Sequence, residues 1–179
     1  MENNNAYTQI LTRRTIRSYE DRPVEKELVE QIVTAGQYAP SGMGKQPTAF
    51  LAVERKELRD TLARLNADVM REKNPKFNAD PFYGAPLIIA VFYDPTVTES
   101  GEMDASAALE NMLLAAHALG LGSCWINRAK QVFESEEGQA IKKEAGIPDR
   151  YVGLSFMVAG YSTQEPKAAP RKSPAVFDL

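Results

Sequence analysis

Residues 87–93 read Leu-Ile-Ile-Ala-Val-Phe-Tyr, an uninterrupted run of apolar and aromatic side chains. Such a run, rich in residues that favour strands, is typical of a β-strand that is covered on both faces. It therefore predicts a sheet with other elements packed on each side. Three further apolar segments with strand character lie at residues 49–53, 122–126 and 152–161.

Helices are expected around these strands, because apolar residues recur there at helical spacing. The expected helices cover residues 25–39, 56–70 and 104–119, a short helix covers residues 5–12, and another follows Ser135. Ser135 is a good N-cap residue, and the glutamates that follow it suit the first turn of a helix. The mixed order of helices and strands favours an α+β or α/β fold with a sheet between helical layers.

The helix expected over residues 104–119 is apolar on two sides. One stripe contains Ala105, Ala108, Leu109, Met112, Leu113, Ala116 and Leu119. The second contains Ala107, Leu114, Ala118 and Leu121. A helix with two apolar sides is either buried in a large core or shared with a partner chain. In a chain of this size we favour a dimer interface.

The length, net charge and composition of the chain exclude several classes of protein. Its 179 residues suit one domain, and the net charge of -3 does not favour a nucleic-acid-binding surface. Cys124 is the only cysteine and His117 the only histidine, which excludes an intrachain disulfide and a four-cysteine zinc site, and no metal site is expected. The N-terminus lacks the layout of a signal peptide, and polar residues interrupt the apolar region 105–121, so no membrane span is expected. We expect one cytoplasmic domain over residues 1–179, with a proline-containing, extended tail over 162–179.

The residue sets of the common catalytic sites are missing. A Ser-His-Asp triad would depend on His117, which lies within an apolar helix and is better interpreted as a core histidine with a satisfied hydrogen bond. The segment 42–45 lacks the spacing of a phosphate-binding P-loop, and no Gly-x-Gly-x-x-Gly pattern is present. Cys124 has no histidine to activate it and is interpreted as a small buried side chain. A bound cofactor is therefore expected to supply the reactivity.

Three segments carry residues suited to such a cofactor. The first is Arg13-Arg14-Thr15-Ile16-Arg17. The planar guanidinium of arginine matches a phosphate group with two parallel hydrogen bonds. In an extended segment, positions 13, 15 and 17 point the same way, so two cations and a hydroxyl share one face. This arrangement suits an anion, although a solvated basic turn has the same pattern.

The other two segments are less specific. Residues 39–47, Ala-Pro-Ser-Gly-Met-Gly-Lys-Gln-Pro, offer backbone N–H groups and polar side chains on a glycine-rich loop, and a plain connecting loop is the alternative. Residues 120–128, Gly-Leu-Gly-Ser-Cys-Trp-Ile-Asn-Arg, place a large aromatic residue at the end of a strand beside a polar turn. There the alternative is that Trp125 belongs to the core.

Taken together and in this order, the three segments resemble the FMN-dependent nitroreductase family, over about residues 8–172. The resemblance implies a central mixed or antiparallel sheet flanked by helices, in an interlocked homodimer with FMN at the subunit interface. It also implies that NADH or NADPH reduces the flavin, which then reduces a small electron-poor acceptor such as a nitroaromatic or a quinone. No nucleic-acid or membrane partner is implied.

The resemblance also assigns roles to individual residues. Arg13 and Arg17 should face the flavin phosphate and the N1–O2 edge, and the backbone between Asn127 and Arg128 should approach N5. The loop at residues 40–42 should come from the second subunit. The implied cofactor-binding residues are Arg13, Arg14, Thr15, Arg17, Pro40, Ser41, Gly42, Gly44, Gln46, Asn66, Trp125, Ile126, Asn127, Arg171 and Lys172.

The chain departs from the family pattern at several positions. Gly44 stands where many members carry Asn, and Thr48 replaces a frequent Trp. Asn127-Arg128 stands where Gly-Gly or Glu-Gly is common, so Arg128 either restricts the substrate or supplies a cation to it. The alternatives to a nitroreductase-like enzyme are a flavin reductase, a reductase for one metabolite, a flavin-storage protein and a dimeric interaction domain without a cofactor.

Overall fold

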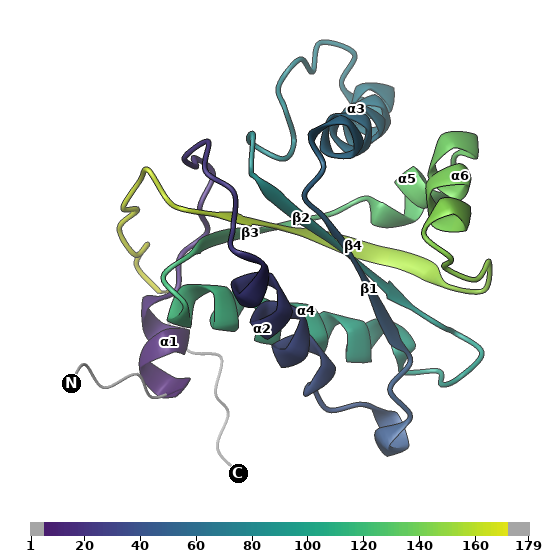
Figure 1. The fold of residues 1–179 in the computed structure, drawn as a ribbon, viewed down its shortest axis with the longest axis horizontal. Coiled ribbons are helices and arrows are strands. Elements are labelled where there is room, and N and C mark those ends of the chain that lie inside the picture. The colour runs from purple at the N-terminus through teal and green to yellow at the C-terminus, as the bar shows by residue number, and fades with distance from the viewer. Residues whose placement is uncertain (1–5, 172–179) are drawn as a thin grey trace.

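The computed structural model describes residues 6–171, and its fold is a four-stranded sheet with helices on both faces (Figure 1). The strands are β1 (Thr48–Val53), β2 (Leu87–Tyr93), β3 (Gly122–Ile126) and β4 (Val152–Gly160). The helices are α1 (Ala6–Thr12), α2 (Lys26–Gln37), α3 (Lys56–Lys73), α4 (Gly101–Ala118), α5 (Ala129–Glu134) and α6 (Glu136–Glu144), with a 3₁₀ turn η1 (Gly42–Gly44).

The sheet has the strand order β1-β2-β4-β3, and every pair is antiparallel. Strand β2 lies between β1 and β4, and its residues 87–92 are at most 1% exposed. The sequence predicted this strand with the same bounds and with cover on both faces, and both predictions are confirmed. The α+β class and the antiparallel sheet are confirmed as well.

The two faces of the sheet are covered by different helices (Figure 1). Leu87, Ile89 and Val91 of β2 point to the side of α2 and α4, where they pack with Leu109 and Met112 of α4. The alternate residues of β2 pack on the side of α3, α5 and α6, with Leu62, Leu65, Val132, Phe133 and Ile141. The period of two along one strand therefore divides the core into two layers.

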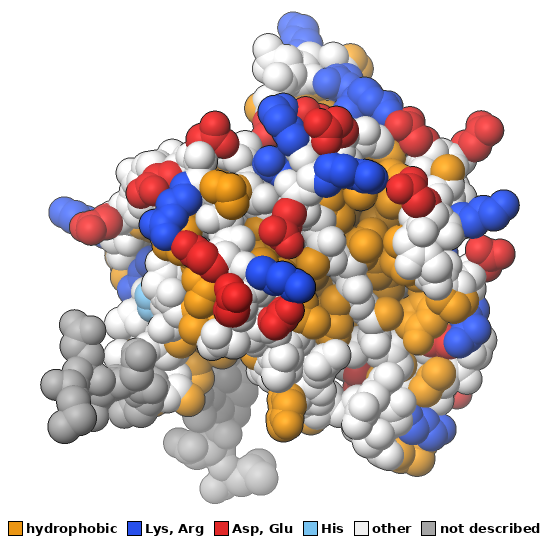
Figure 2. Space-filling view, in the orientation of Figure 1, with side chains coloured by type: hydrophobic (Ala, Val, Ile, Leu, Met, Phe, Trp, Pro, Cys, Tyr) orange, Lys and Arg blue, Asp and Glu red, His pale blue; other side chains and the backbone are white. Residues whose placement is uncertain are grey.

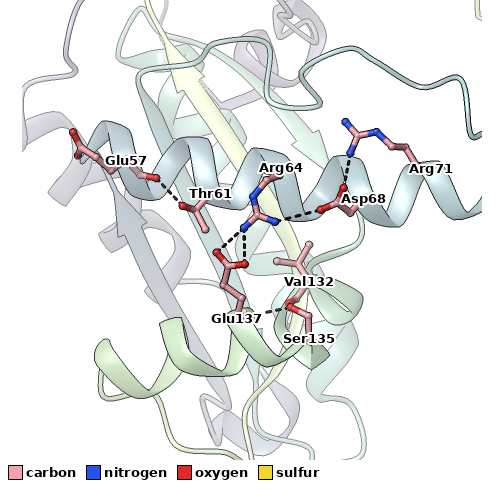
Figure 3. Close-up of polar contacts among 9 residues, drawn as sticks. Glu57, Thr61, Arg64, Asp68, Arg71, Val132, Ser135 and Glu137 are labelled. Atoms are coloured by element: carbon pink, nitrogen blue, oxygen red, sulfur yellow. Dashed lines mark hydrogen bonds and ion pairs between the residues drawn. The ribbon is translucent and has the colours of Figure 1, made fainter.

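A polar cluster connects α3 to α6 on the outer surface of the second layer (Figure 3). Arg64 of α3 bonds Glu137 of α6 and also contacts Asp68, which pairs with Arg71. These side chains are about half exposed, so solvent screening leaves the pairs little net effect on stability. Ser135 begins α6 as the sequence predicted, and its hydroxyl accepts a hydrogen bond from the Gly138 N–H at 3.1 Å.

Helix α5 was missed by the sequence analysis. It contains six residues between Arg128 and Ser135, and so short a helix shows no repeating apolar stripe. The other expected helices are present with ends shifted by a few residues, as between residues 104–119 and the observed Gly101–Ala118.

The N-terminal segment and the start of the C-terminal tail meet beside β3 and β4. Thr15 pairs in parallel with Ser123 of β3, and Tyr19 pairs with Ser162. The Ser18 and Thr163 hydroxyls are 2.6 Å apart. Residues 162–171 form no helix, whereas the last part of the expected tail, including Lys172, lies outside the described residues.

The core-facing stripe of α4 is buried, but its second stripe is only partly covered by the described chain. Leu114 is half-buried and Ala118 is exposed, whereas Leu121 lies in the core because the chain turns at Gly120 (φ 79°). His117, on the same side as Leu114, is half-buried rather than a core residue. No helix in the described part of the chain is both long and apolar enough to cross a membrane.

Candidate functional site

The arginine segment lies extended along the free edge of β3. The Ile16 N–H donates to the Ser123 carbonyl at 2.9 Å, and the Ile16 side chain lies against Gly122. A Cβ atom on Gly122 would lie only 2.7 Å from Ile16 Cγ2, so the glycine permits this close approach. The Tyr19 hydroxyl donates to the Ile16 carbonyl at 2.6 Å, and burial raises the pKa of Tyr19. The segment is thus fixed from both sides.

The three arginines of this segment have different surroundings. Arg13 Nε lies 3.8 Å from a carboxylate oxygen of Glu110 on α4. The Arg14 guanidinium turns back onto the backbone and donates to the Leu11 and Arg13 carbonyls at 2.8 and 2.7 Å. Arg17 is exposed, with its guanidinium carbon 5.9 Å from the centre of the Tyr83 ring. Within residues 6–171, Arg17 forms no ion pair, so its charge is available to an anion.

A cavity of about 360 Å³ lies between this segment, the end of α4 and the start of the tail. Arg13, Arg14, His117 and Ser123 are among the residues that line it. The Ser123 hydroxyl is buried and has no hydrogen-bond partner among the described residues, which is unfavourable unless a ligand or water supplies one. The Arg13 guanidinium beside this hydroxyl forms a donor set that suits a phosphate or a similar anion.

His117 connects the wall of this cavity to α1. Its Nε2 lies 2.8 Å from the Thr12 hydroxyl, which itself donates to the Thr8 carbonyl at 2.7 Å. The Thr12 oxygen therefore accepts from His117, which places the imidazole proton on Nε2. Burial lowers the pKa of His117, and the positive charges of Arg13 and Arg14 lower it further. The sequence prediction of a satisfied hydrogen bond is thus confirmed for this residue.

A second cavity, of about 220 Å³, lies on the other side of Arg17. Tyr83, Trp125, Asn127 and Arg128 line it together with Arg17. Trp125 Nε1 lies 2.9 Å from Asn127 Oδ1 and 2.9 Å from the Ser155 hydroxyl. Trp125 is therefore not a plain core residue, because its ring packs partly on the α4 side of the sheet and the residue also borders the cavity. Ile126 is buried in the other layer and borders the same cavity.

The turn after β3 is held by Asn66 of α3. Asn66 is fully buried, its Nδ2 donates to the Asn127 carbonyl at 2.9 Å, and its Oδ1 accepts from Arg128 Nε at 3.0 Å. Arg128 has φ 81°, a left-handed conformation that is uncommon for a residue with a side chain. The resemblance implied that Asn66 binds the cofactor, at the pyrimidine edge of the flavin. In the folded chain most of its amide is engaged by this turn, which leaves one N–H for that role.

The glycine-rich loop after α2 is held from the first turn of α4. The Gly42 N–H donates to both carboxylate oxygens of Asp104, at 3.1 and 3.2 Å, and the Gln46 N–H donates to the Ser41 hydroxyl at 2.9 Å. A Cβ atom on Gly42 would lie 2.3 Å from the Ser100 hydroxyl, so this position also needs glycine. Pro40 and Gly44 of the loop are exposed.

Within a single chain, this loop lies far from the arginine segment. Asp104 holds the loop at the start of α4, and His117 lies near the arginines at its end. Thirteen residues of helix separate the two by about 20 Å, at a rise of about 1.5 Å per residue. Figure 1 shows η1 and α1 at opposite ends of α4. Arg171 is exposed at the end of the described chain, and Lys172 lies beyond it.

Charged side chains of both signs are interspersed over the face of the molecule in Figure 2. Binding to a long polyanion requires a broad patch of positive charge, and that face shows no such patch. The arginine segment is therefore a local feature. Its chemistry suits one small anionic group rather than a nucleic-acid backbone.

Comparison with known proteins adds an independent observation. A family model described as the nitroreductase family matches residues 10–161, which is most of the chain. The chain belongs to the nitroreductase family. The resemblance stated from the three sequence segments is thereby confirmed.

Solved structures of nitroreductases resemble this one along nearly their whole length. A nitroreductase from Bacteroides fragilis with bound FMN has a TM-score of 0.87 and 28% sequence identity, with 98% of each chain covered. An FMN-dependent nitroreductase from Clostridium difficile has a TM-score of 0.73 and 32% identity, with 90% of each chain covered. A relative from Bacillus subtilis named FMN reductase [NAD(P)H] is 28% identical, over 94% of this chain and 70% of the relative.

Two functional features of this nitroreductase were not found in the sequence. Asp104 was only the first residue of the helix expected over residues 104–119. First-turn carboxylates are common in helices, and nothing local indicates that this one holds a loop 62 residues away. Ser123 lay within a quoted segment but attracted no role. Its unpaired hydroxyl becomes visible only when the arginine segment, β3 and the tail are assembled.

Proposed function

We propose that this nitroreductase is an FMN-dependent NAD(P)H oxidoreductase that forms a homodimer with FMN between its subunits. The observation that carries the proposal is the buried, unpaired Ser123 hydroxyl in the cavity bordered by Arg13 and Arg14. That donor set suits the phosphate of FMN. FMN bound in the related Bacteroides fragilis structure supports the choice of anion.

Different residues of the site would contact different parts of the proposed cofactor. Arg13, Thr15 and Ser123 would hold the phosphate, with Arg14 contributing mainly backbone because its guanidinium is folded back on the chain. Arg171 and Lys172 of the tail would add charge. When bound, FMN takes a hydride from NADH or NADPH and passes electrons to an electron-poor acceptor.

The remaining residues would create the environment for that chemistry. Arg17 would place a fixed cation at the N1–O2 edge of the ring, where negative charge develops. Asn66 would keep the Asn127–Arg128 turn, with its backbone N–H groups, in one conformation. Asp104 would hold the loop of Pro40, Ser41, Gly42, Gly44 and Gln46 for delivery to the partner subunit.

Two parts of the proposed cofactor site, the glycine-rich loop and the arginine segment, lie apart within one chain, and this separation supports the dimer. The loop held by Asp104 and the segment that contains Arg17 lie near opposite ends of α4. The partly exposed stripe with Leu114 and Ala118 lies on the same helix. A second copy of the chain that covers this stripe would bring a loop from one subunit to the arginines of the other.

The test is to purify the protein and measure its flavin content and its oxidation of NADH and NADPH. We expect a yellow protein that holds about one FMN per chain and consumes reduced nicotinamide when given menadione or a nitroaromatic compound. A colourless protein that does not bind added FMN would contradict the proposal.

A flavin reductase is a second candidate, and the Bacillus subtilis FMN reductase supports it. The two activities differ in whether free flavin or another compound receives the electrons. Anaerobic stopped-flow measurements with NADPH distinguish both enzymes from a flavin-storage protein. A storage protein would hold FMN, but NADPH would not rapidly bleach the flavin absorbance. Comparison of rates with free FMN and with menadione then decides between the enzymes.

A further inference from the structure

The proposed cofactor site uses the backbone of Arg128 but gives no role to its cationic side chain. The turn that contains it is assigned to the flavin through its backbone alone. Its side chain is half-buried and borders the cavity of about 220 Å³ that Arg17, Tyr83 and Trp125 also line. Its guanidinium can therefore contact a second ligand that binds beside the proposed flavin in that cavity.

The position of this guanidinium is fixed before any ligand binds. Arg128 Nε donates to Asn66 Oδ1 at 3.0 Å, and Asn66 is fully buried and bonded to the adjacent carbonyl of Asn127 at 2.9 Å. The two terminal nitrogens of Arg128 make no hydrogen bond to any described residue. These two nitrogens form the fork that binds a carboxylate with parallel hydrogen bonds. A fork that is already oriented loses little conformational freedom on binding.

The positive charge of the cavity is only partly balanced by its own walls, where Asp80 is one carboxylate beside two guanidinium groups. Neither Arg17 nor Arg128 forms an ion pair within residues 6–171. Asp80 also borders the cavity, but its two carboxylate oxygens accept hydrogen bonds from the Phe82 and Gly84 N–H groups, at 2.8 and 2.6 Å. Burial lowers the pKa of Arg128, so its charge is partly desolvated. An anionic ligand would relieve this unfavourable state.

Apolar and aromatic residues also line the cavity. Met70, Phe77 and Tyr83 are among them. Aromatic side chains favour stacked or edge-on contacts with a flat ring. The cavity therefore combines surfaces for a planar aromatic body with a preoriented cation for an anionic substituent.

We propose that Arg128 selects aromatic electron acceptors that carry a carboxylate or a comparable anionic group. This inference rests on the proposed function, because it names the class of acceptor for that reaction. Arg17 is taken by the cofactor in the same scheme. Arg128 then provides the cation that distinguishes a charged acceptor from a neutral one of the same shape.

The kinetic test compares 4-nitrobenzoate with 4-nitrobenzamide, which differ mainly in charge. We expect the ratio of their kcat/KM values to favour the carboxylate in the native enzyme. We expect Arg128→Gln to lower that ratio at least about tenfold, the effect of losing about 1.4 kcal/mol of differential binding. Arg128→Lys should give an intermediate ratio, because the charge remains and the fork is lost. An unchanged ratio in Arg128→Gln would overturn the proposal.

Lys130→Gln is the matched control. It removes one positive charge two residues along the chain, at an exposed lysine whose Nζ lies 4.0 Å from Glu134 on the same helix. The ratio should be unchanged in this variant. A similar fall in both variants would show a general effect of net charge and would overturn the specific role of Arg128.

A binding test separates this inference from the proposed function. Benzoate and benzamide are titrated into the FMN-loaded protein without NAD(P)H, and the fluorescence of Trp125, the only tryptophan, is followed. We expect benzoate to bind at least about tenfold more weakly to Arg128→Gln than to the native protein, and benzamide to show no such difference. Benzoate binding through Arg128 in a protein that oxidises no NAD(P)H would support this site while the proposed reaction fails. Loss of FMN from Arg128→Gln would assign the side chain to the cofactor and overturn the inference.

Discussion

At the scale of single residues, Arg17 gives the sharpest test of the proposed cofactor site. It is exposed, forms no ion pair within residues 6–171 and borders the cavity of about 220 Å³. We expect Arg17→Ala to weaken FMN binding at least about tenfold, because a charge-assisted hydrogen bond contributes about 1.5–3 kcal/mol. Equilibrium dialysis with FMN measures the change.

Arg55→Ala is the control for this substitution. Arg55 is also exposed, and its one ion pair is with Glu144 at 3.4 Å, on the α3 and α6 side of the molecule. The control should bind FMN as the native protein does. Equal affinities for all three proteins would show that Arg17 does not contact the cofactor.

Site residues proposed for their own side-chain chemistry could be named from the sequence, whereas contacts with distant partners could not. Arg13 and Arg17 were proposed as anion-binding residues because their chemistry and spacing are visible in five consecutive residues. The contact of Asn66 with Arg128 joins positions 62 apart, and its meaning depends on a left-handed backbone at Arg128 that no local pattern required. The pairing of Tyr19 with Ser162 brings the start of the tail beside the N-terminal segment.

At the scale of elements, the close contact between the arginine segment and β3 can be tested at Gly122. A Cβ there would meet Ile16 Cγ2 and Cγ1 at 2.7 and 2.8 Å. We expect Gly122→Ala to lower the free energy of unfolding by about 1–3 kcal/mol, as overpacking does. It should also weaken FMN binding, because the arginine segment is displaced from the strand. Urea denaturation and FMN dialysis measure the two effects.

The control for Gly122→Ala is the same substitution in an Ile16→Ala background. Removing both Cγ atoms of Ile16 relieves the two shortest contacts with the new methyl group, although Ile16 Cβ remains 2.9 Å away. The two substitutions should therefore be non-additive, with a coupling free energy of at least about 0.5 kcal/mol in a double-mutant cycle. Additive effects would mean that the contact of Gly122 with Ile16 does not limit the packing.

The elements themselves were predicted where the apolar pattern was long or continuous. Strands β2 and β3 have their predicted bounds. Strand β2 is an uninterrupted apolar run that ends at Asp94, and β3 follows the turn at Gly120 and ends before the polar Asn127. Helix α5 was missed because it is only six residues long. The pairing order β1-β2-β4-β3 was not predicted at all, since it depends on contacts between segments far apart in the sequence.

At the scale of the whole molecule, the proposed dimer and the proposed cofactor site should be lost together. Leu114 lies on the partly covered stripe of α4, between the loop at one end of the helix and the arginines at the other. Leu114→Glu would place a charge in an apolar interface, and an unpaired buried charge is strongly unfavourable. We therefore expect a folded monomer that has lost its FMN. Light scattering after size-exclusion chromatography, with absorbance of the eluted flavin, measures both in one experiment.

Ala140→Glu provides the control at this scale. Ala140 is an exposed residue of α6, on the opposite side of the sheet from α4, and the substitution introduces the same charge into a helix. This variant should remain a yellow dimer, and circular dichroism should show native helix content for both proteins. A Leu114→Glu monomer that retains FMN at native affinity would place the whole cofactor site within one chain. In that case the separation between the loop held by Asp104 and the arginine segment would have no role in cofactor binding.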